Sequence, residues 1–365
     1  MALTQVQAGM MDSTAQYYSF KNRIINGAMV IDQRNAGASV TPTTTTNGFP
    51  VDRFQISVTQ NSKLTTQQST TAPAGFNNSL LVTSSSAYSV LSSDVFVIRQ
   101  SIEGFNFADL GFGTASAATV TLSFWVRSSL TGTFGGSLRN SAGNRSYPFS
   151  YTISSANTWE QKSITITGDT TGTWLTTNGV GIYLQFGLGV GTTYSGTAGS
   201  WAGANYLSAT GATSVVGTNG ATFYLTGVQL EKGSTATSFD YRPYGTELAL
   251  CQRYYYQLMY EDSGVNNYFY RTYSAAAANY TNSLVPFPVT MRANPTCSLS
   301  SISHFSPATA VGGGGSAFTG GAIDSVSPSS IGTSGFTGST GLAAGNATVV
   351  TANTSSAWIA ASAEL

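Results

Sequence analysis

Apolar and polar residues alternate along several short stretches of the chain. Every second residue of Thr119–Arg127 is apolar, and the same pattern runs through Gly181–Val190. Asp94–Arg99 and Ser163–Thr167 are shorter stretches of the same kind. Because a period of two places successive side chains on opposite faces of a strand, each stretch predicts a β-strand with one buried face.

The stretch 223–230 changes phase partway along. Its apolar residues fall on odd numbers before Gly227 and on even numbers after it, so we expect a β-bulge at this glycine. Turn signals separate the strands, with Thr-Asn-Gly at 46–48, 177–179 and 218–220, and Gly168–Asp169 elsewhere. Many short strands between such turns predict an all-β fold, an antiparallel jelly-roll sandwich.

Helical patterns are scarce. The best candidate is Thr246–Met259, which follows a proline and a glycine and would connect the sandwich to a second, smaller β domain. Within that domain, 311–346 is nearly all Gly, Ser, Thr and Ala, and we expect loops there rather than a tail. Terminal strands are expected in Ala347–Thr351 and Trp358–Leu365.

Composition narrows the function classes. Of the 365 residues only 8% are charged and the net charge is zero, against about 25% charged in an average protein. Without a basic surplus we expect no nucleic-acid binding, and no apolar run is long enough for membrane insertion. The first twenty residues do not resemble a secretory signal, and Cys251 and Cys297 are expected to be unpaired thiols. From Ala293 to the end only Asp324 and Glu364 are charged, which favours burial between subunits and hence an oligomer.

No catalytic or metal-binding motif is evident. His304 is the one histidine and is expected to be a surface or turn residue, so no zinc site and no cofactor are predicted. A glycosidase would need two carboxylates across the sugar. Asp94, Glu103 and Asp109, or the neighbours 261 and 262, could supply them, but spacing does not show that any pair converges. We therefore predict that the protein is not an enzyme.

Aromatic residues point to binding instead. Rings that stack on sugar faces suit a neutral polysaccharide, and the candidate ligand-binding residues are Tyr268, Tyr270, Tyr273, Trp201 and Tyr206. The alternative is that these rings are core or subunit-interface residues.

One stretch concentrates charged and aromatic residues. The sequence QLEKGSTATSFDYRPYGTELALCQRYY at 229–255 resembles a signature of bacteriophage and prophage tail-fibre proteins. KNRIINGAMVIDQR at 21–34, followed by VDRF at 51–54, resembles the opening of the same unit, and FPVTMRANPT at 287–296 and the ending ASAEL resemble a C-terminal tip domain. The resemblance implies a jelly roll like that of carbohydrate-binding modules, and no common catalytic set.

We expect the charged residues of these bracketing segments to form a structural seam where the first and last strands of the jelly roll meet. The residues concerned are Arg34, Asp52, Arg53, Asp240 and Arg242, together with Asp32. Buried Arg–carboxylate pairs would fix the register there rather than bind a ligand.

These observations predict a virion protein, a phage tail fibre or tail-tip receptor-binding protein that is a homotrimer. Residues 1–21 would attach to other tail or baseplate proteins, 22–245 would form the jelly roll, and 246–365 the tip domain. The partner outside the particle would be a host surface polysaccharide, bound with multivalency. The alternatives are an adaptor or decoration protein of the virion, a glycan depolymerase, and a bacterial carbohydrate-binding module or adhesin.

Overall fold

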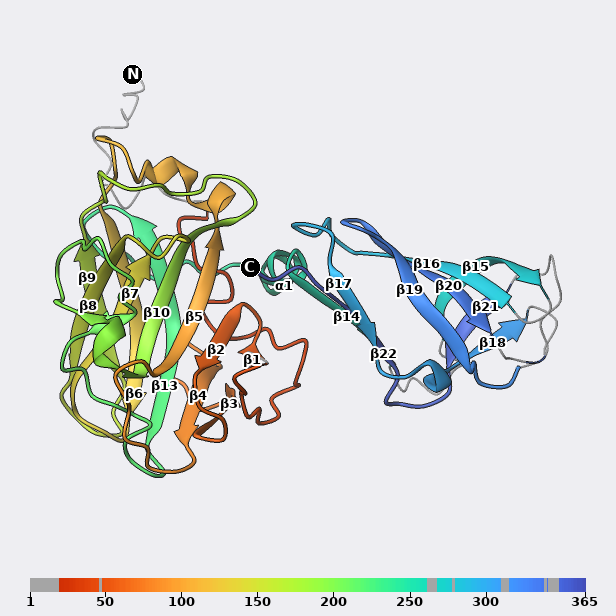
Figure 1. The fold of residues 1–365 in the computed structure, drawn as a ribbon, viewed down its shortest axis with the longest axis horizontal. Coiled ribbons are helices and arrows are strands. Elements are labelled where there is room, and N and C mark those ends of the chain that lie inside the picture. Colours follow the sequence, from red (N-terminus) through yellow and green to blue (C-terminus); the bar gives the residue numbers. More distant parts are fainter. Residues whose placement is uncertain are drawn as a thin grey trace, which may run out of the picture. The chain divides into compact units, whose positions relative to one another are not determined.

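A computed structural model describes residues 20–45, 48–260, 268–277, 280–309, 315–337, 340 and 348–365. The chain divides into two compact units, the first formed by residues 1–247 and 365, the second by residues 248–364 (Figure 1). The expected boundary after residue 245 lies inside α1, the helix Tyr244–Gln252.

The first unit contains two large antiparallel sheets. The six-stranded sheet has the order β1 (Gly48–Val51), β2 (Phe54–Val58), β5 (Val95–Glu103), β10 (Val180–Val190), β7 (Gly132–Arg139), β8 (Ser146–Ile153). The five-stranded sheet has the order β3 (Leu64–Ser69), β4 (Ser79–Ser84), β13 (Thr222–Lys232), β6 (Val120–Ser128), β9 (Glu160–Ile166). A short parallel pair, β11 (Ser195–Gly196) and β12 (Ser208–Ala209), accompanies them.

Alternating apolar residues of both sheets form one core. Leu122 and Phe124 of β6, and Leu184 and Phe186 of β10, are almost completely buried. The rings of Phe124 and Phe186 meet at a centroid distance of 5.0 Å, which packs one sheet against the other. Each such side chain contributes about 1.5–3 kcal/mol by leaving water. The predicted antiparallel jelly-roll sandwich is confirmed.

The phase slip in β13 is a bulge, as predicted. Its pairing with β6 shifts register between Thr226 and Gln229, and Gly227 has a φ of 60°. A Cβ at Gly227 would lie 2.7 Å from the Phe76 ring and 3.0 Å from Trp125. Glycine is therefore required here both by the left-handed backbone and by the close approach of two rings.

The second unit is also all-β. One sheet has the order β14 (Tyr255–Met259), β22 (Trp358–Ser362), β17 (Thr296–Leu299). The other has the order β18 (Phe305–Thr309), β21 (Thr348–Ala352), β15 (Tyr268–Ala277), β16 (Tyr280–Pro286), β20 (Ser330–Thr337), β19 (Gly320–Ser327). Its core includes Phe305, Phe318, Phe336 and Ile359. The two predicted terminal strands correspond to β21 and β22.

Two local predictions are wrong. The helix ends at Gln252 rather than continuing to Met259, because residues 255–259 pair with β22 as a strand. Aromatic residues at 254–256 favour this extended backbone, and Tyr254 is fully buried. The Gly- and Ser-rich region is not only loop, since β19 and β20 form an antiparallel pair within it.

The thiols agree with the prediction that no disulfide forms. Cys251 is buried, Cys297 is half-buried, and neither is in a disulfide. Burial raises the pKa of the Cys297 thiol to about 11, so it stays protonated at neutral pH. In the described part of the chain no helix has the length and apolar character that crossing a membrane requires.

Candidate functional site

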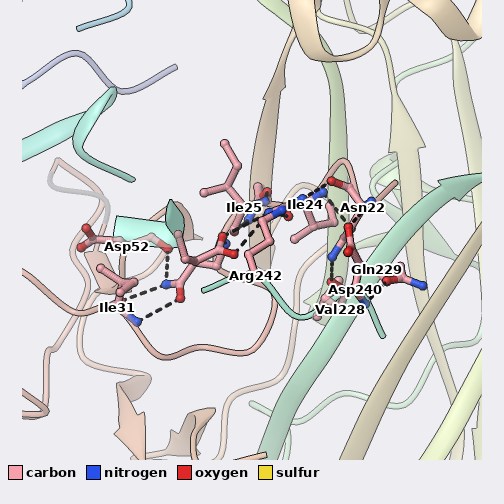
Figure 2. Close-up of polar contacts among 12 residues, drawn as sticks. Asn22, Ile24, Ile25, Ile31, Asp52, Val228, Gln229, Asp240 and Arg242 are labelled. Carbon is pink, nitrogen blue, oxygen red and sulfur yellow. Dashed lines mark hydrogen bonds and ion pairs between the residues drawn. The ribbon is translucent and has the colours of Figure 1, made fainter. Parts of the chain in front are cut away.

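The segments 21–34 and 229–255, which bracket the jelly roll, meet at a polar seam inside the first unit (Figure 2). Arg242, which follows β13, donates from Nη1 to the carbonyl of Ile24 at 3.1 Å and from Nη2 to the carbonyl of Asn22. The same Nη1 forms an ion pair with Glu247 at 3.2 Å, and Glu247 also accepts the backbone N–H of Asn26. One arginine therefore ties the start of the unit to its end.

A second set of bonds fixes the register of β13 against the N-terminal segment. The backbone N–H of Arg23 donates to the carbonyl of Leu230 at 2.9 Å. Asn22 donates its side-chain amide to Val228 O at 3.0 Å and accepts from Leu230 N–H at 3.0 Å. Asp240 accepts the backbone N–H of Asn22 at 3.2 Å. These contacts use backbone groups that an edge segment would otherwise leave unsatisfied.

The other charged residues predicted for the seam are also buried or half-buried. Asp52 pairs with Arg34 at 3.2 Å and accepts the backbone N–H of Gln33 at 3.2 Å. Arg53 has a φ of 70° and donates to the carbonyl of Ser101 at 2.5 Å. Asp32 accepts the N–H groups of a following turn rather than an arginine.

Sequence reasoning missed the uncharged members of this seam. Asn26 is fully buried with a φ of 60°, and its amide donates to the carbonyls of Ile31 and Asp52, both at 2.9 Å. Gln229 accepts the backbone N–H of Asp240 at 2.8 Å. An Asn-Gly pair such as that at 26–27 is typical of a tight turn, but nothing local indicates that this side chain holds two distant carbonyls.

The predicted ligand-binding aromatics lie in different places. Trp201 donates its indole N–H to Thr167 O at 2.7 Å and packs edge-on against Trp174 and Phe112. Tyr206 lies over Gly196, where a Cβ would come within 2.2 Å of the tyrosine ring. These contacts give both rings a packing role in the sandwich.

The remaining three, Tyr268, Tyr270 and Tyr273, belong to strand β15 of the second unit, and their side chains lie outside what the structure describes. Residues 1–19 of the predicted attachment segment, and the acidic pair at 261 and 262, lie entirely outside the described residues.

An aromatic strip that sequence reasoning missed lies on the outer face of the five-stranded sheet. We define it as Tyr241, Phe239, Phe76, Trp125, Tyr224 and Trp159. The first three rings form a cluster with centroid distances of 4.8–5.5 Å. Gly227 brings Phe76 near Trp125, and Trp159 meets Tyr224 at 6.0 Å. All six are at least partly exposed to solvent.

The strip has one positive charge within it. Arg127 lies over the ring of Tyr224 at 5.1 Å and donates from Nε to the carbonyl of Asn157 at 2.9 Å. Register explains why these residues meet, because Tyr224 of β13 is directly opposite Arg127 of β6. Alternation alone places each of them on an outer face but does not say which neighbours they have.

A second candidate surface, which carries two arginines, lies on the outer face of the six-stranded sheet. Tyr183 of β10 is directly opposite Arg139 of β7, and Gln185 is directly opposite Arg99 of β5. Both guanidinium groups lie over the Tyr183 ring, at 5.0 Å for Arg99 and 4.6 Å for Arg139. Burial lowers the pKa of each arginine below its ordinary value.

Two of the carboxylates considered for glycoside cleavage, Asp94 and Glu103, lie far apart. Asp94 precedes β5 and Glu103 ends it, which separates them by roughly 30 Å at about 3.3 Å per residue. Such a distance is far outside the roughly 5–10 Å of a glycosidase pair. Asp94 accepts hydrogen bonds from Tyr88, Leu91 and Thr59, and Asp109 pairs with Arg23 at 2.8 Å.

His304 lies in a short 3-10 turn, and its Nδ1 is 2.9 Å from the Ser300 hydroxyl. Among the described residues no group of three or more His, Cys, Asp or Glu side chains is arranged to hold a metal ion.

No protein-family model matches this chain, and no curated protein sequence matches it. Solved structures that it resembles include the enzymatically active domain of tailspike protein 4 from bacteriophage CBA120, with 12% identity and a TM-score of 0.32 over 58% of this chain. The match spans 22% of the tailspike chain.

Others are the family 11 carbohydrate-binding module from Clostridium thermocellum, with 10% identity and a TM-score of 0.28, covering 55% of this chain and all of the module. A xylan-binding domain from Paenibacillus barcinonensis matches with 8% identity and a TM-score of 0.24, covering 56% and 99% of the two chains.

Proposed function

We propose that this chain is a structural protein of a bacteriophage particle, a tail-fibre or tail-tip protein that attaches the particle to a host-surface glycan. It acts as a homotrimer and docks to other tail or baseplate proteins through residues 1–21. The resemblance of 21–34 and 229–255 to tail-fibre proteins supports the virion role. The meeting of both segments at one seam supports their assignment as the two ends of a single folded unit.

The aromatic strip is the observation that carries glycan recognition. Partly exposed rings offer flat apolar faces on which sugar rings stack, and Arg127 adds hydrogen-bond donors beside them. A surface with so little charge suits an uncharged sugar chain. The further candidates for sugar contacts remain Tyr268, Tyr270, Tyr273, Trp201 and Tyr206.

The test is binding of the labelled full-length protein to host cells, compared with cells whose surface glycans have been oxidised with periodate. We expect binding to the untreated cells only. Trp159→Ala and Tyr224→Ala should each weaken it roughly tenfold, which corresponds to about 1.4 kcal/mol per site. Phe105→Ala is the matched control, because Phe105 is 61% exposed in the same unit but lies outside the strip.

Other outcomes would favour the alternative roles. Firm association with particles, but no binding to cells by the folded wild-type protein, would indicate an adaptor or decoration protein. Glycan cleavage that a carboxylate substitution abolishes would indicate a depolymerase. Cell binding that the strip variants leave unchanged would move recognition to another surface, with β15 of the second unit the next to test.

A further inference from the structure

Two arginines on the six-stranded sheet share one tyrosine ring. Arg99, Tyr183 and Arg139 come from the neighbouring strands β5, β10 and β7, and all three point away from the core. Both guanidinium carbons are within about 5 Å of the ring centroid, so the two positive charges lie close together. Cation–π contact holds each group in place beside the ring.

Neither guanidinium is paired with a carboxylate among the described residues. Arg99 donates from Nε and Nη2 to one oxygen of Gln185, at 3.3 and 3.2 Å. Arg139 donates from Nη1 to Asn205 Oδ1 at 2.5 Å, while its buried Nε has no hydrogen-bond partner in the described part of the protein. Most of the N–H groups of these two arginines therefore have no acceptor within the described residues. In contrast, Arg145 in the same unit forms a two-pronged pair with Asp169 at 2.7 Å on both prongs.

The arrangement is electrostatically unfavourable by itself. Burial, and then the positive charge of Arg139, lower the pKa of Arg99 to about 10. Two desolvated like charges without a counter-charge are costly for a folded protein, and a bound anion would relieve that cost.

We propose that this face is a binding site for the carboxylate of an acidic sugar, such as a hexuronate unit within a polysaccharide. The proposal rests on the glycan recognition proposed above and adds a charged sugar to it, at a surface separate from the aromatic strip. The planar guanidinium group matches the two oxygens of a carboxylate. Gln185 is buried and positions Arg99, whereas Asn205, which positions Arg139, is exposed and supplies an amide group for a sugar hydroxyl at the same place.

The neighbouring backbone favours contact with a single sugar unit over contact with a nucleic acid. Ser208 of β12 lies against Gly135 and Gly187, where added Cβ atoms would come within 2.5 and 2.6 Å of its hydroxyl oxygen. The segment around β12 therefore covers the sheet beside the arginines and leaves less open surface. A nucleic acid would need many phosphate contacts, whereas this site offers two cations in a chain of zero net charge.

The test uses the full-length protein and defined probes in calorimetry at low salt. The probes are oligosaccharides that contain gluco-, galacto- or mannuronate, the same oligosaccharides with each carboxyl reduced to an alcohol, and sodium sulfate. We expect at least one uronate probe to bind and its reduced form to bind weakly or not at all. Arg139→Gln and Arg99→Gln should each weaken uronate binding roughly ten- to hundredfold, because each removes charge-assisted hydrogen bonds.

Lys63→Gln is the matched control, since it also removes a cation from a tyrosine ring, that of Tyr88 at 5.1 Å, but belongs to neither proposed surface and should leave uronate affinity unchanged. Without ligand, Arg139→Gln should melt no lower than the wild type, because a desolvated like charge is removed. If that variant does not fold, the comparison of acidic and reduced probes on the wild-type protein still tests the acidic-sugar site.

The outcomes separate this proposal from the proposed function. Equal binding of acidic and reduced probes would overturn the acidic-sugar site while glycan recognition stood. Binding of sulfate as tight as that of the best uronate would show a simple anion site and overturn it too. No binding of any uronate would overturn it, and cell binding through the aromatic strip would be unaffected.

Discussion

Replacing Arg242 by alanine should destabilise the first unit strongly. Its side chain is 5% exposed, and that of its partner Glu247 is 11% exposed. The substitution removes the donors to two carbonyls, those of Asn22 and Ile24, and leaves the Glu247 carboxylate without its cation. The seam would then lose one of the side chains that join its two segments, while the bonds of Asn22 and Asp240 remained.

The magnitude follows from these contacts. Breaking a buried ion pair by removing one partner costs about 3–5 kcal/mol, and this range already includes most of the penalty for an uncompensated charge. Water that enters the space of the lost side chain would satisfy part of what the two carbonyls lose. We expect about 4 kcal/mol, which is roughly 8–16 °C in melting temperature for a unit of this size.

The assay is thermal unfolding of the full-length protein by calorimetry, with hydrogen exchange of peptides from β13 to assign the transition to the first unit. Arg23→Ala is the matched control, because Arg23 lies in the same segment but pairs with Asp109, a carboxylate that is half exposed. We expect the control to cost less than about 1 kcal/mol. Equal losses in the two variants, or lost glycan binding by a stable Arg242→Ala protein, would refute the structural role of the seam.

Three further perturbations test the fold. Gly227→Ala should lower the free energy of unfolding by about 2 kcal/mol or more, because alanine is strained in the left-handed backbone and its Cβ would press on Phe76. Thermal melting measures this loss, and an unchanged melting temperature would contradict the bulge geometry. Asn26→Ala should cost about 2–4 kcal/mol by leaving two buried carbonyls without their amide donor, a loss that urea unfolding would detect; near-wild-type stability would contradict it. Burial would raise the pKa of Asp169, but the hydrogen bonds from Arg145 outweigh it and lower that pKa. The pair therefore stabilises the fold above about pH 4, and this stabilisation is lost as the pH falls through the pKa of Asp169 in the folded protein. Asp169→Asn should thus lower stability at neutral pH and flatten its decline in acid; an acid limb as steep as that of the wild type would contradict the assignment.

The strands could be predicted from the sequence because alternation is a local property. The two longest alternating stretches match β6 and β10 to within one residue at each end. The phase slip at Gly227 was visible for the same reason, since one extra residue reverses which side of a strand is apolar. The end of the helix could not be predicted, because Tyr255–Met259 becomes a strand only by pairing with β22, about a hundred residues further along the chain.

The residues of the candidate surfaces could be named only in part. The outer side of three strands carries Arg99, Tyr183 and Arg139. These residues are distant in sequence, and they meet only because β5, β10 and β7 are neighbours in the sheet. The charged seam was expected from the charge concentration, but Glu247 was not assigned to it. A truncation at the predicted boundary after residue 245 would delete this carboxylate and damage the first unit.

The sequence by itself determined the all-β class, the alternating core positions, the bulge and the absence of a disulfide framework, because each depends on neighbouring residues or on composition. The tertiary structure alone decided which strands lie side by side, and hence that six aromatic rings form one strip and that two arginines share one tyrosine. The reason is physical: backbone pairing sets which side chains are neighbours, and that pairing depends on the packing of the whole sandwich.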